Sequence, residues 1–301
     1  MRKINTKIKI LLLVVVASAA LSPFLYKRLN VYYKCRKINR ELEKNITSEA
    51  REFSGKYSVY VKGLGELKFF YFYNINEKFP AASLIKVPVM AAVFNKISKG
   101  KLNLDSEFVL GKKDITPGSG VLRYHKTPFK ITLGELIEFM ITKSDNTAAN
   151  KIIDILGFEY MNDFFADIGL RDTYIRRKMM DFTSRAKGVE NYTSSKDMAY
   201  ILEKIYKKEL INGYYSRMML SLLKRQKFND RIPKYLPKGT VVAHKTGLEK
   251  NVVSDVGVVF SNSCDYILCV ITSDFKSYKQ AKYFIAKLSK VIYNTQDKNK
   301  L

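Results

Sequence analysis

Residues 252–272 read VVSDVGVVF-SNS-CDYILCVIT, two apolar runs rich in β-branched residues on either side of a Ser-Asn-Ser turn. This pattern predicts two adjacent strands, which we place at residues 252–260 and 266–272. A single pair of strands is barely stable in water, so further strands must lie beside it. Residues 56–64 and 67–73 supply them from the other end of the chain, because both are rich in Tyr and Phe and a Gly-Glu pair between them favours a hairpin.

Helical periodicity fills most of the interval between these strands. Strands at both ends with helices between them predict an α/β fold in the α+β sense: an antiparallel sheet of N- and C-terminal strands, covered by helices, with an inserted all-helical lobe. We divide the folded domain, residues 35–296, into a sheet lobe (about residues 35–82 and 225–296) and a helical lobe (about residues 83–224). The predicted helices are residues 36–54, 84–97, 133–141, 147–156, 161–168, 195–206, 214–223 and 276–292.

The first 34 residues have the features of a targeting segment. Four basic residues precede an apolar run over residues 10–26, and its 17 residues are near the lower limit for spanning a bilayer. Ala17-Ser18-Ala19 resembles a signal-peptidase site, but apolar residues continue past it, which favours an uncleaved anchor. At the other end, residues 294–301 are polar and expected to fray, and we assign residues 297–301 to a disordered tail.

The composition restricts the partners and cofactors. The 301 residues include 53 Lys and Arg against 28 Asp and Glu, a formal net charge of +25 that favours an anionic membrane or wall surface. The basic residues are spread along the chain and no nucleic-acid-binding motif occurs, so we expect no nucleic acid partner. Three cysteines and two histidines show no metal-ligand spacing. We therefore predict free thiols, no metal, no cofactor and a monomer.

Ser83-Leu84-Ile85-Lys86 stands at the start of an apolar helix. Lys86 follows Ser83 by three residues, so both side chains share one helical face. The free N–H groups of a helix start favour negative charge near the serine oxygen, and a lysine whose pKa is lowered by burial can accept the serine proton. The alternative is that Ser83 only caps the helix, and the motif taken alone favours that alternative.

Two further motifs follow at intervals of 61 and 101 residues. In Ser144-Asp145-Asn146, the serine can relay a proton to a leaving nitrogen and the asparagine can bind a substrate amide, although all three residue types are common N-caps. In Lys245-Thr246-Gly247, the lysine and threonine can bind a carboxylate, and the glycine lets a substrate approach a strand edge. An exposed lysine with a glycine bulge at a strand end is the alternative.

Together, the three motifs equip a serine acyl-transfer enzyme that works without histidine. Over roughly residues 50–295 the chain resembles the class A β-lactamases and related penicillin-interacting serine enzymes. The resemblance extends to LGEL at residues 133–136, to ITKSDNTAAN at residues 141–150, and to His244 before a Val-rich strand. It implies a serine hydrolase with Ser83 as nucleophile, Lys86 as its proton partner, Ser144 and Asn146 beside them, Lys245, Thr246 and Gly247 binding the substrate, and the N–H groups of Ser83 and Leu248 as oxyanion hole.

One element of the family pattern is missing. Class A β-lactamases carry a glutamate in a Glu-x-x-Leu-Asn loop that activates the deacylating water, and no such string occurs here. Asp181 is the nearest carboxylate by position, 37 residues after Ser144, and we predict it as the deacylation base. Glu190 is a second candidate. The alternative for Asp181 is a turn or cap residue.

Three functions are compatible with these residues. The first is hydrolysis of β-lactams through an acyl-enzyme on Ser83, and the second is a D,D-peptidase that acts on D-Ala-D-Ala wall peptides and is inhibited by β-lactams. The third is a β-lactam sensor, for which fewer than 40 preceding residues leave little room for a signalling module. All these ligands lie outside the bacterial cytoplasm. We therefore expect an extracytoplasmic body on a membrane anchor, or a secreted one after cleavage, although basic residues after the span outnumber those before it.

Overall fold

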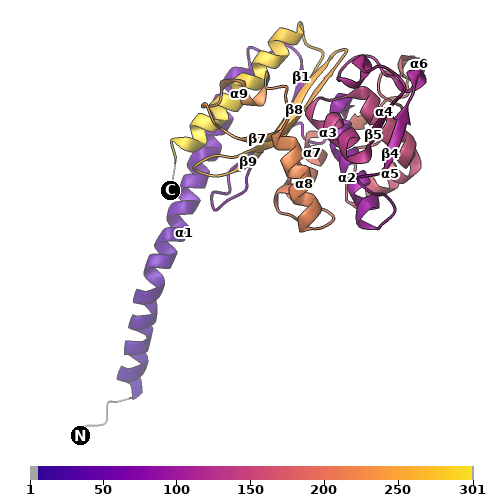
Figure 1. Ribbon diagram of the computed structural model, residues 1–301. Helices are drawn as coiled ribbons and strands as arrows, with labels where there is room; N and C mark the ends of the chain where they lie inside the picture. Colours follow the sequence, from indigo (N-terminus) through magenta and orange to yellow (C-terminus); the bar gives the residue numbers. More distant parts are fainter. Residues whose placement is uncertain (1–5, 300–301) are drawn as a thin grey trace.

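A five-stranded antiparallel sheet forms the centre of the molecule, with the strand order β2-β1-β9-β8-β7. The computed structural model describes the backbone of residues 6–299 and the side chains of residues 25–299. Strands from the two ends of the chain pair at β1 and β9, so the fold class predicted from the sequence is confirmed (Figure 1). The strands are β1 (Lys56–Gly63), β2 (Phe70–Tyr73), β7 (Val242–Glu249), β8 (Val252–Val259) and β9 (Tyr266–Ser273).

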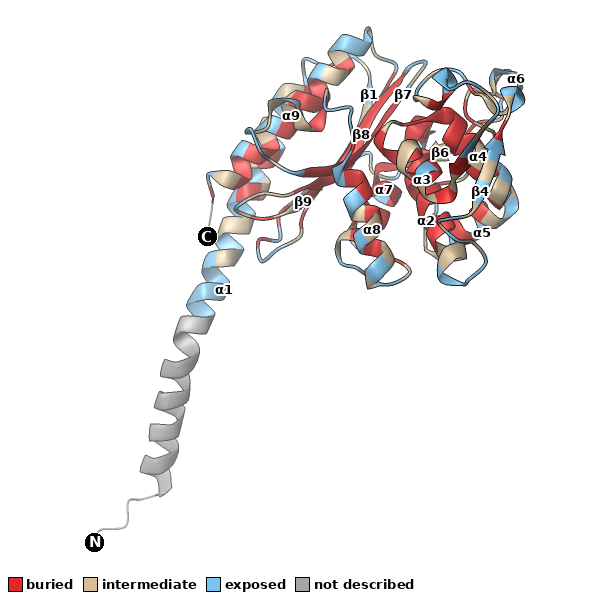
Figure 2. Ribbon diagram, in the orientation of Figure 1, coloured by how far each residue is buried: buried red, intermediate tan, exposed pale blue. Residues whose placement is uncertain are grey.

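Alternate residues of the central strands face two separate apolar layers. In β9, Leu268 faces the layer that contains α1 (Thr6–Ala50) and α9 (Tyr278–Asp297), whereas Ile267 and Cys269 face the helical lobe. Figure 2 shows the sheet buried between these layers. Because both faces of a central strand are covered, its sequence reads as a continuous apolar run rather than as an alternation.

The helical lobe packs on the face of the sheet opposite α1 and α9 (Figure 1). Edge strand β7 contacts this lobe through η1 and α8, so the two lobes meet along β7. The remaining elements are η1 (Ala82–Ile85), α2 (Lys86–Ser98), η2 (Lys112–Asp114), η3 (Leu122–Tyr124), α3 (Leu133–Thr142), α4 (Asn146–Leu156), α5 (Phe158–Asp167), α6 (Phe182–Ala186), α7 (Ser195–Tyr206), α8 (Gly213–Lys224), η4 (Ile232–Tyr235) and the short strands β3 (Phe79–Pro80), β4 (Glu107–Leu110), β5 (Phe129–Thr132) and β6 (Tyr192–Thr193).

The two terminal helices differ from the prediction. Helix α1 begins at Thr6 rather than at residue 36. Helix α9 continues to Asp297, and beyond it the Asn299 amide donates to Glu41 Oε2 at 3.1 Å. Fraying was predicted for this end of the chain, whereas α1 holds it as far as Asn299. Residues 300–301 lie outside the described part, and the disordered tail stays a prediction.

The predicted membrane anchor at residues 10–26 falls almost wholly outside the side chains that the structure describes, which begin at residue 25. Within the described part of the chain, no helix combines the length and the apolar character needed to cross a membrane. The anchor therefore stays a prediction.

Candidate active site

Ser83 lies in a tight turn where the helical lobe meets the sheet. It belongs to the 3₁₀ helix η1, which runs directly into α2. The N-cap positions of these two helices are Ala81 and Ile85, so the capping interpretation of Ser83 is wrong. Ala82 has a φ of 45°, a backbone conformation that costs roughly 1–3 kcal/mol and is concentrated at functional sites.

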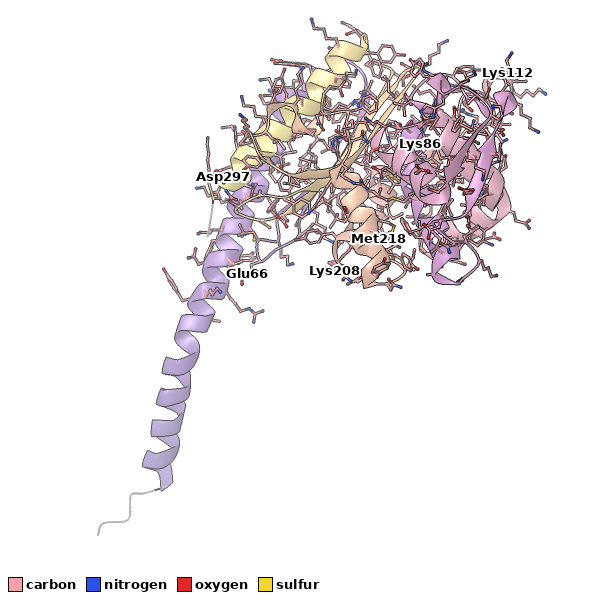
Figure 3. All side chains as sticks on the ribbon, viewed as in Figure 1. Glu66, Lys86, Lys112, Lys208, Met218 and Asp297 are labelled. Atoms are coloured by element: carbon pink, nitrogen blue, oxygen red, sulfur yellow. The ribbon has the colours of Figure 1, made fainter. Side chains whose placement is uncertain are left out.

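Lys86 is fully buried, one helical turn after Ser83, between the two lobes (Figure 3). Its Nζ donates to the backbone carbonyl of Ser144 at 2.7 Å and to Asn146 Oδ1 at 2.8 Å. Burial lowers the pKa of Lys86 to about 7, although attraction to Asp145 acts in the opposite direction. Near neutral pH a large fraction of Lys86 is therefore free amine, the form that can accept a proton.

The three residues of the Ser144-Asp145-Asn146 turn have different roles. Asp145 is structural: it caps α4 by accepting from the Ala148 N–H at 3.0 Å, and its second oxygen accepts from the N–H groups of Val121 and Leu122. The capping alternative therefore holds for Asp145 alone. Ser144, at a φ of 52°, and Asn146 turn their side chains towards Lys86.

Lys245 approaches the same turn from strand β7. Its Nζ donates to Ser144 Oγ at 2.9 Å and to the carbonyl oxygen of Thr246 at 2.9 Å. Burial, the nearby Lys86 and then Arg231 hold the pKa of Lys245 well below its usual range, and Asp255 opposes them. The exposed-lysine alternative is therefore wrong, because Lys245 is completely buried at the centre of the site.

Gly247 brings the free edge of β7 against the turn that holds Ser83. A Cβ at this position would lie 3.3 Å from Leu84 Cγ and 3.5 Å from Ala82 Cβ. Strand β7 is an edge strand, so groups along its outer side can pair with a ligand. The two residues predicted to form the oxyanion hole, Ser83 and Leu248, therefore lie on elements in direct contact.

Arg231 is a further cation that the sequence reasoning missed. It is 3% exposed, and its Nε has no hydrogen-bond partner among the described residues. The next residue, Ile232, donates its N–H to Asp255 at 3.0 Å, and Asp255 in turn pairs with His244 on β7. These hydrogen bonds hold the backbone next to Arg231 in place, and Arg231 lies close enough to Lys245 to lower its pKa. No motif marked Arg231, because only tertiary packing brings it to the site.

Asp181 does not have the environment of a general base. It is the N-cap of α6: Oδ1 accepts from the Ser184 N–H at 2.9 Å and Oδ2 accepts from Ser184 Oγ at 2.6 Å. The bonds from Ser184 lower the pKa of Asp181. The cap alternative therefore describes this residue, and the structure gives no support to its predicted catalytic role.

Two methionines, Met179 and Met180, directly precede Asp181 in the stretch where the sequence predicted the deacylation base. Asn150 holds the backbone of Met179 at both ends, donating to its carbonyl at 3.0 Å and accepting from its N–H at 2.7 Å. The Met180 thioether and the Asn146 amide both lie against Gly118. A Cβ added to this glycine would be 3.2 Å from Met180 Sδ and 2.8 Å from Asn146 Nδ2. The Met180 thioether thus forms part of this wall of the site.

Glu190 and Glu249 share two arginines behind this loop. Arg177 Nη2 lies 2.6 Å from Glu190 Oε1 and 2.7 Å from Glu249 Oε1, and Arg185 contacts both carboxylates. Glu190 has both oxygens engaged. Oε1 also accepts from the Asn191 N–H, and Oε2 lies 3.3 Å from Arg185 Nε. In contrast, Glu249 Oε2 is buried without a partner among the described residues. Glu249 is therefore the carboxylate here with an oxygen left for another group.

Comparison with known proteins agrees with the resemblance seen in the sequence. The model of a family described as the beta-lactamase enzyme family matches residues 41–296. The chain belongs to the beta-lactamase enzyme family. A beta-lactamase of Phocaeicola vulgatus is 28% identical over 243 residues (73% of this chain, 75% of that one), and the beta-lactamase SME-1 of Serratia marcescens is 26% identical over 262 residues (84% and 88%).

Two solved structures add to this family assignment. The beta-lactamase from Sphaerobacter thermophilus superposes with a TM-score of 0.79 at 27% identity, covering 86% of this chain and 97% of that one. The structure of PBP-A has a TM-score of 0.78 at 29% identity, covering 86% and 96%, and a mutant of PBP-A was solved as its acyl-enzyme complex with penicillin G.

The residues predicted for acylation and the residue predicted for deacylation differ in their surroundings. The structure brings Lys86, Ser144, Asn146 and Lys245 into one hydrogen-bonded cluster. It leaves Asp181 outside that cluster. Among the side chains that the structure describes, no group of three His, Cys, Asp or Glu residues is arranged to hold a metal ion.

Proposed function

We propose that this protein is a serine β-lactamase that hydrolyses β-lactams through an acyl-enzyme on Ser83. The observation that carries the proposal is the convergence of two buried lysines on Ser144 Oγ, 3.4 Å from Lys86 Nζ and 2.9 Å from Lys245 Nζ, beside the Ser83 turn. Amines with lowered pKa values next to a serine on a strained turn are the equipment for activating a hydroxyl.

Acylation follows from these positions. Neutral Lys86 takes the proton of Ser83 as its oxygen attacks the β-lactam carbonyl carbon. The N–H groups of Ser83 and Leu248 stabilise the negative oxygen that develops, and Ser144, bonded to Lys245, passes a proton to the ring nitrogen as the C–N bond breaks. Lys245 and Arg231 supply positive charge for the substrate carboxylate.

For release of the acyl group we assign Glu249 as the base. Alternate residues of a strand share a face, so Glu249 lies on the face of β7 that carries Lys245 and Gly247. Its unpartnered Oε2 takes one proton from a water, and the water oxygen bonds to the ester carbon. The C–Oγ bond to Ser83 then breaks, and the proton passes to Ser83 Oγ. Arg177 and Arg185 fix the carboxylate through Oε1.

A D,D-peptidase that cleaves D-Ala-D-Ala wall peptides is the second candidate. Its support is the pair Met179 and Met180 where the family carries a glutamate loop, together with the likeness to PBP-A. In that case β-lactams would acylate Ser83 and remain bound, because release would lack a well-placed base.

We further propose that residues 1–34 anchor the protein in the membrane, with the body outside the cytoplasm. The support is the apolar run over residues 10–26 and the extracytoplasmic location of β-lactams and wall peptides. Protease added to intact, wall-stripped cells should digest the domain. A domain that stays protected until the membrane is permeabilised would overturn this location.

The function is tested with the full chain in neutral detergent. We expect rapid turnover of a chromogenic cephalosporin, together with a short-lived fluorescent penicillin label that Ser83→Ala abolishes. A stable label on Ser83 without turnover contradicts the β-lactamase and supports the peptidase. If Ser83 takes up no label, both assignments are wrong.

A further inference from the structure

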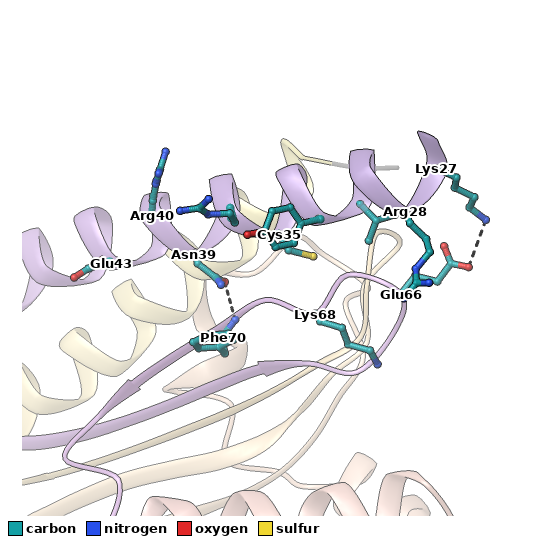
Figure 4. A pocket seen from close by; sticks show the side chains of 12 residues that line it. Lys27, Arg28, Cys35, Asn39, Arg40, Glu43, Glu66, Lys68 and Phe70 are labelled. Atoms are coloured by element: carbon teal, nitrogen blue, oxygen red, sulfur yellow. Dashed lines mark hydrogen bonds and ion pairs between the residues drawn. The ribbon is translucent and has the colours of Figure 1, made fainter. Parts of the chain in front are cut away.

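A cavity remote from Ser83 separates α1 from the chain that leads into β2. It measures about 850 Å³, within the roughly 300–1,000 Å³ that ligand sites occupy. At one end Lys27 pairs with Glu66 at 3.7 Å, and at the other Asn39 Oδ1 accepts from the Phe70 N–H at 2.8 Å (Figure 4). We call this space the α1 groove; the helix and the hairpin meet at its two ends and stand apart between them.

The α1 groove is rich in positive charge. Five basic side chains line it against two acidic ones, Glu43 and Glu66. Of the five, only Lys27 has an ion pair among the described residues, so Arg28, Arg36, Arg40 and Lys68 leave the positive charge of the lining unbalanced. An anionic group is the ligand that such an unbalanced lining favours.

The same groove has apolar and aromatic walls. Val31 and Tyr32 come from α1, and Phe70 comes from the facing strand. Tyr32 and Phe70 are 54% and 51% exposed. Exposed aromatic rings beside basic residues are typical of a protein surface at the lipid–water interface. A soluble polyanion would use the charges but would leave these walls bare.

We propose that the α1 groove binds one anionic phospholipid, with its phosphate on Arg28 and Lys68 and an acyl chain against Val31 and Phe70. The groove begins at Lys27, directly after the apolar run at residues 10–26, so an anchored protein would hold it at the bilayer surface. The membrane position rests on the proposed anchor, whereas the binding chemistry rests on the groove alone.

Cys35 provides a natural reporter, because its thiol points into the groove (Figure 4). It is partly exposed, whereas Cys264 and Cys269 are buried. The experiment measures the rate of N-ethylmaleimide addition to Cys35 by intact mass, using the full chain in neutral detergent. We expect phosphatidylglycerol to slow the reaction, and equal amounts of phosphatidylcholine or inorganic phosphate to leave it unchanged.

The matched variants are Arg28→Gln/Lys68→Gln and, as a control, Lys37→Gln/Lys44→Gln on the outer side of α1. Both remove two charges from exposed positions. The groove variant should need about 30-fold more phosphatidylglycerol for the same protection, as expected for the loss of two basic contacts with an anionic lipid. Equal weakening by the control variant, protection by phosphate alone, or no protection by phosphatidylglycerol would overturn the proposal.

Discussion

Lys86 and Lys245 reach the same oxygen, Ser144 Oγ, from opposite lobes, at 3.4 Å and 2.9 Å. Two buried ammonium groups this close repel each other, and Lys86 is indeed one cause of the lowered pKa of Lys245. The repulsion favours a state in which one of the two lysines is neutral, and Ser144 is the hydroxyl through which the two lysines can exchange a proton.

The rate of acylation should fall in acid with a midpoint near pH 7. Burial lowers the pKa of Lys86 to about 7, and only the neutral amine can take the Ser83 proton. Below that pH the rate should drop about tenfold per pH unit, and above it the rate should level off. Stopped-flow labelling with a fluorescent penicillin between pH 5 and 9 measures this. A rate independent of pH across that range would remove Lys86 from the role of base.

The same lysine should make the folded state more stable in mild alkali. The unfolded chain keeps the Lys86 proton up to its usual pKa of 10.5, whereas the folded chain releases it near 7, so unfolding takes up a proton between these values. The free energy of unfolding should therefore rise by about 2 kcal/mol from pH 7 to pH 9 on account of Lys86. Urea titrations of the wild type and of Lys86→Met at pH 7 and pH 9 measure this change in the free energy of unfolding. An equal change in the two proteins would contradict the prediction.

Asp181→Asn should leave turnover within about twofold, since the Asp181 carboxylate serves Ser184 and asparagine is an equally good N-cap. Steady-state kinetics with a chromogenic cephalosporin provide the measurement. A loss of tenfold or more in the deacylation rate would restore Asp181 as the base and contradict the geometry described above.

The sequence predicted the members of the hydrogen-bonded cluster because each lies in a short motif whose local structure follows from the chain itself. Ser83 and Lys86 are one turn apart, and Asp145 caps the helix that positions Asn146. The remaining groups depend on tertiary packing. Glu249 gains its role from arginines 64 and 72 residues away, and Arg231 gains its role from the Asp255–His244 brace. Spacing along the sequence indicates neither of these contacts. The spacing from Ser144 instead led to the prediction of Asp181 as the deacylation base.

Gly120→Ala should damage both the fold and the site. Gly120 has a φ of +120°, and an added Cβ would lie 2.1 Å from Asp145 Oδ2 and 2.6 Å from Asp145 Cα. The matched control is Gly188→Ala, with a φ of +80° and open space around the Cβ. Each substitution should lower the free energy of unfolding by roughly 1–3 kcal/mol because of the backbone conformation. Only Gly120→Ala should also displace the Ser144 turn. Denaturation midpoints and acylation rates should separate the two, and equal losses would show that strain alone matters.

Glu249→Gln should trap the acyl-enzyme. The change removes the unpartnered carboxylate oxygen while leaving an acceptor for Arg177 and Arg185, so acylation of Ser83 should persist. Deacylation should slow by about 10²–10⁴-fold, the usual contribution of a positioned general base. Intact mass after mixing with penicillin G measures the fraction of enzyme that carries the acyl group over time.

Glu190→Gln is the control that separates chemistry from support. Glu190 binds the same Arg177 and Arg185, but both of its oxygens are already engaged, so this change loosens the loop without removing a free base. If the arginine cluster only holds the loop in place, the two variants should slow deacylation alike. If Glu249 activates the water, the acyl-enzyme should accumulate in Glu249→Gln and clear at nearly the wild-type rate in Glu190→Gln. Rapid clearance in Glu249→Gln would overturn the assignment, because the water would then be activated elsewhere.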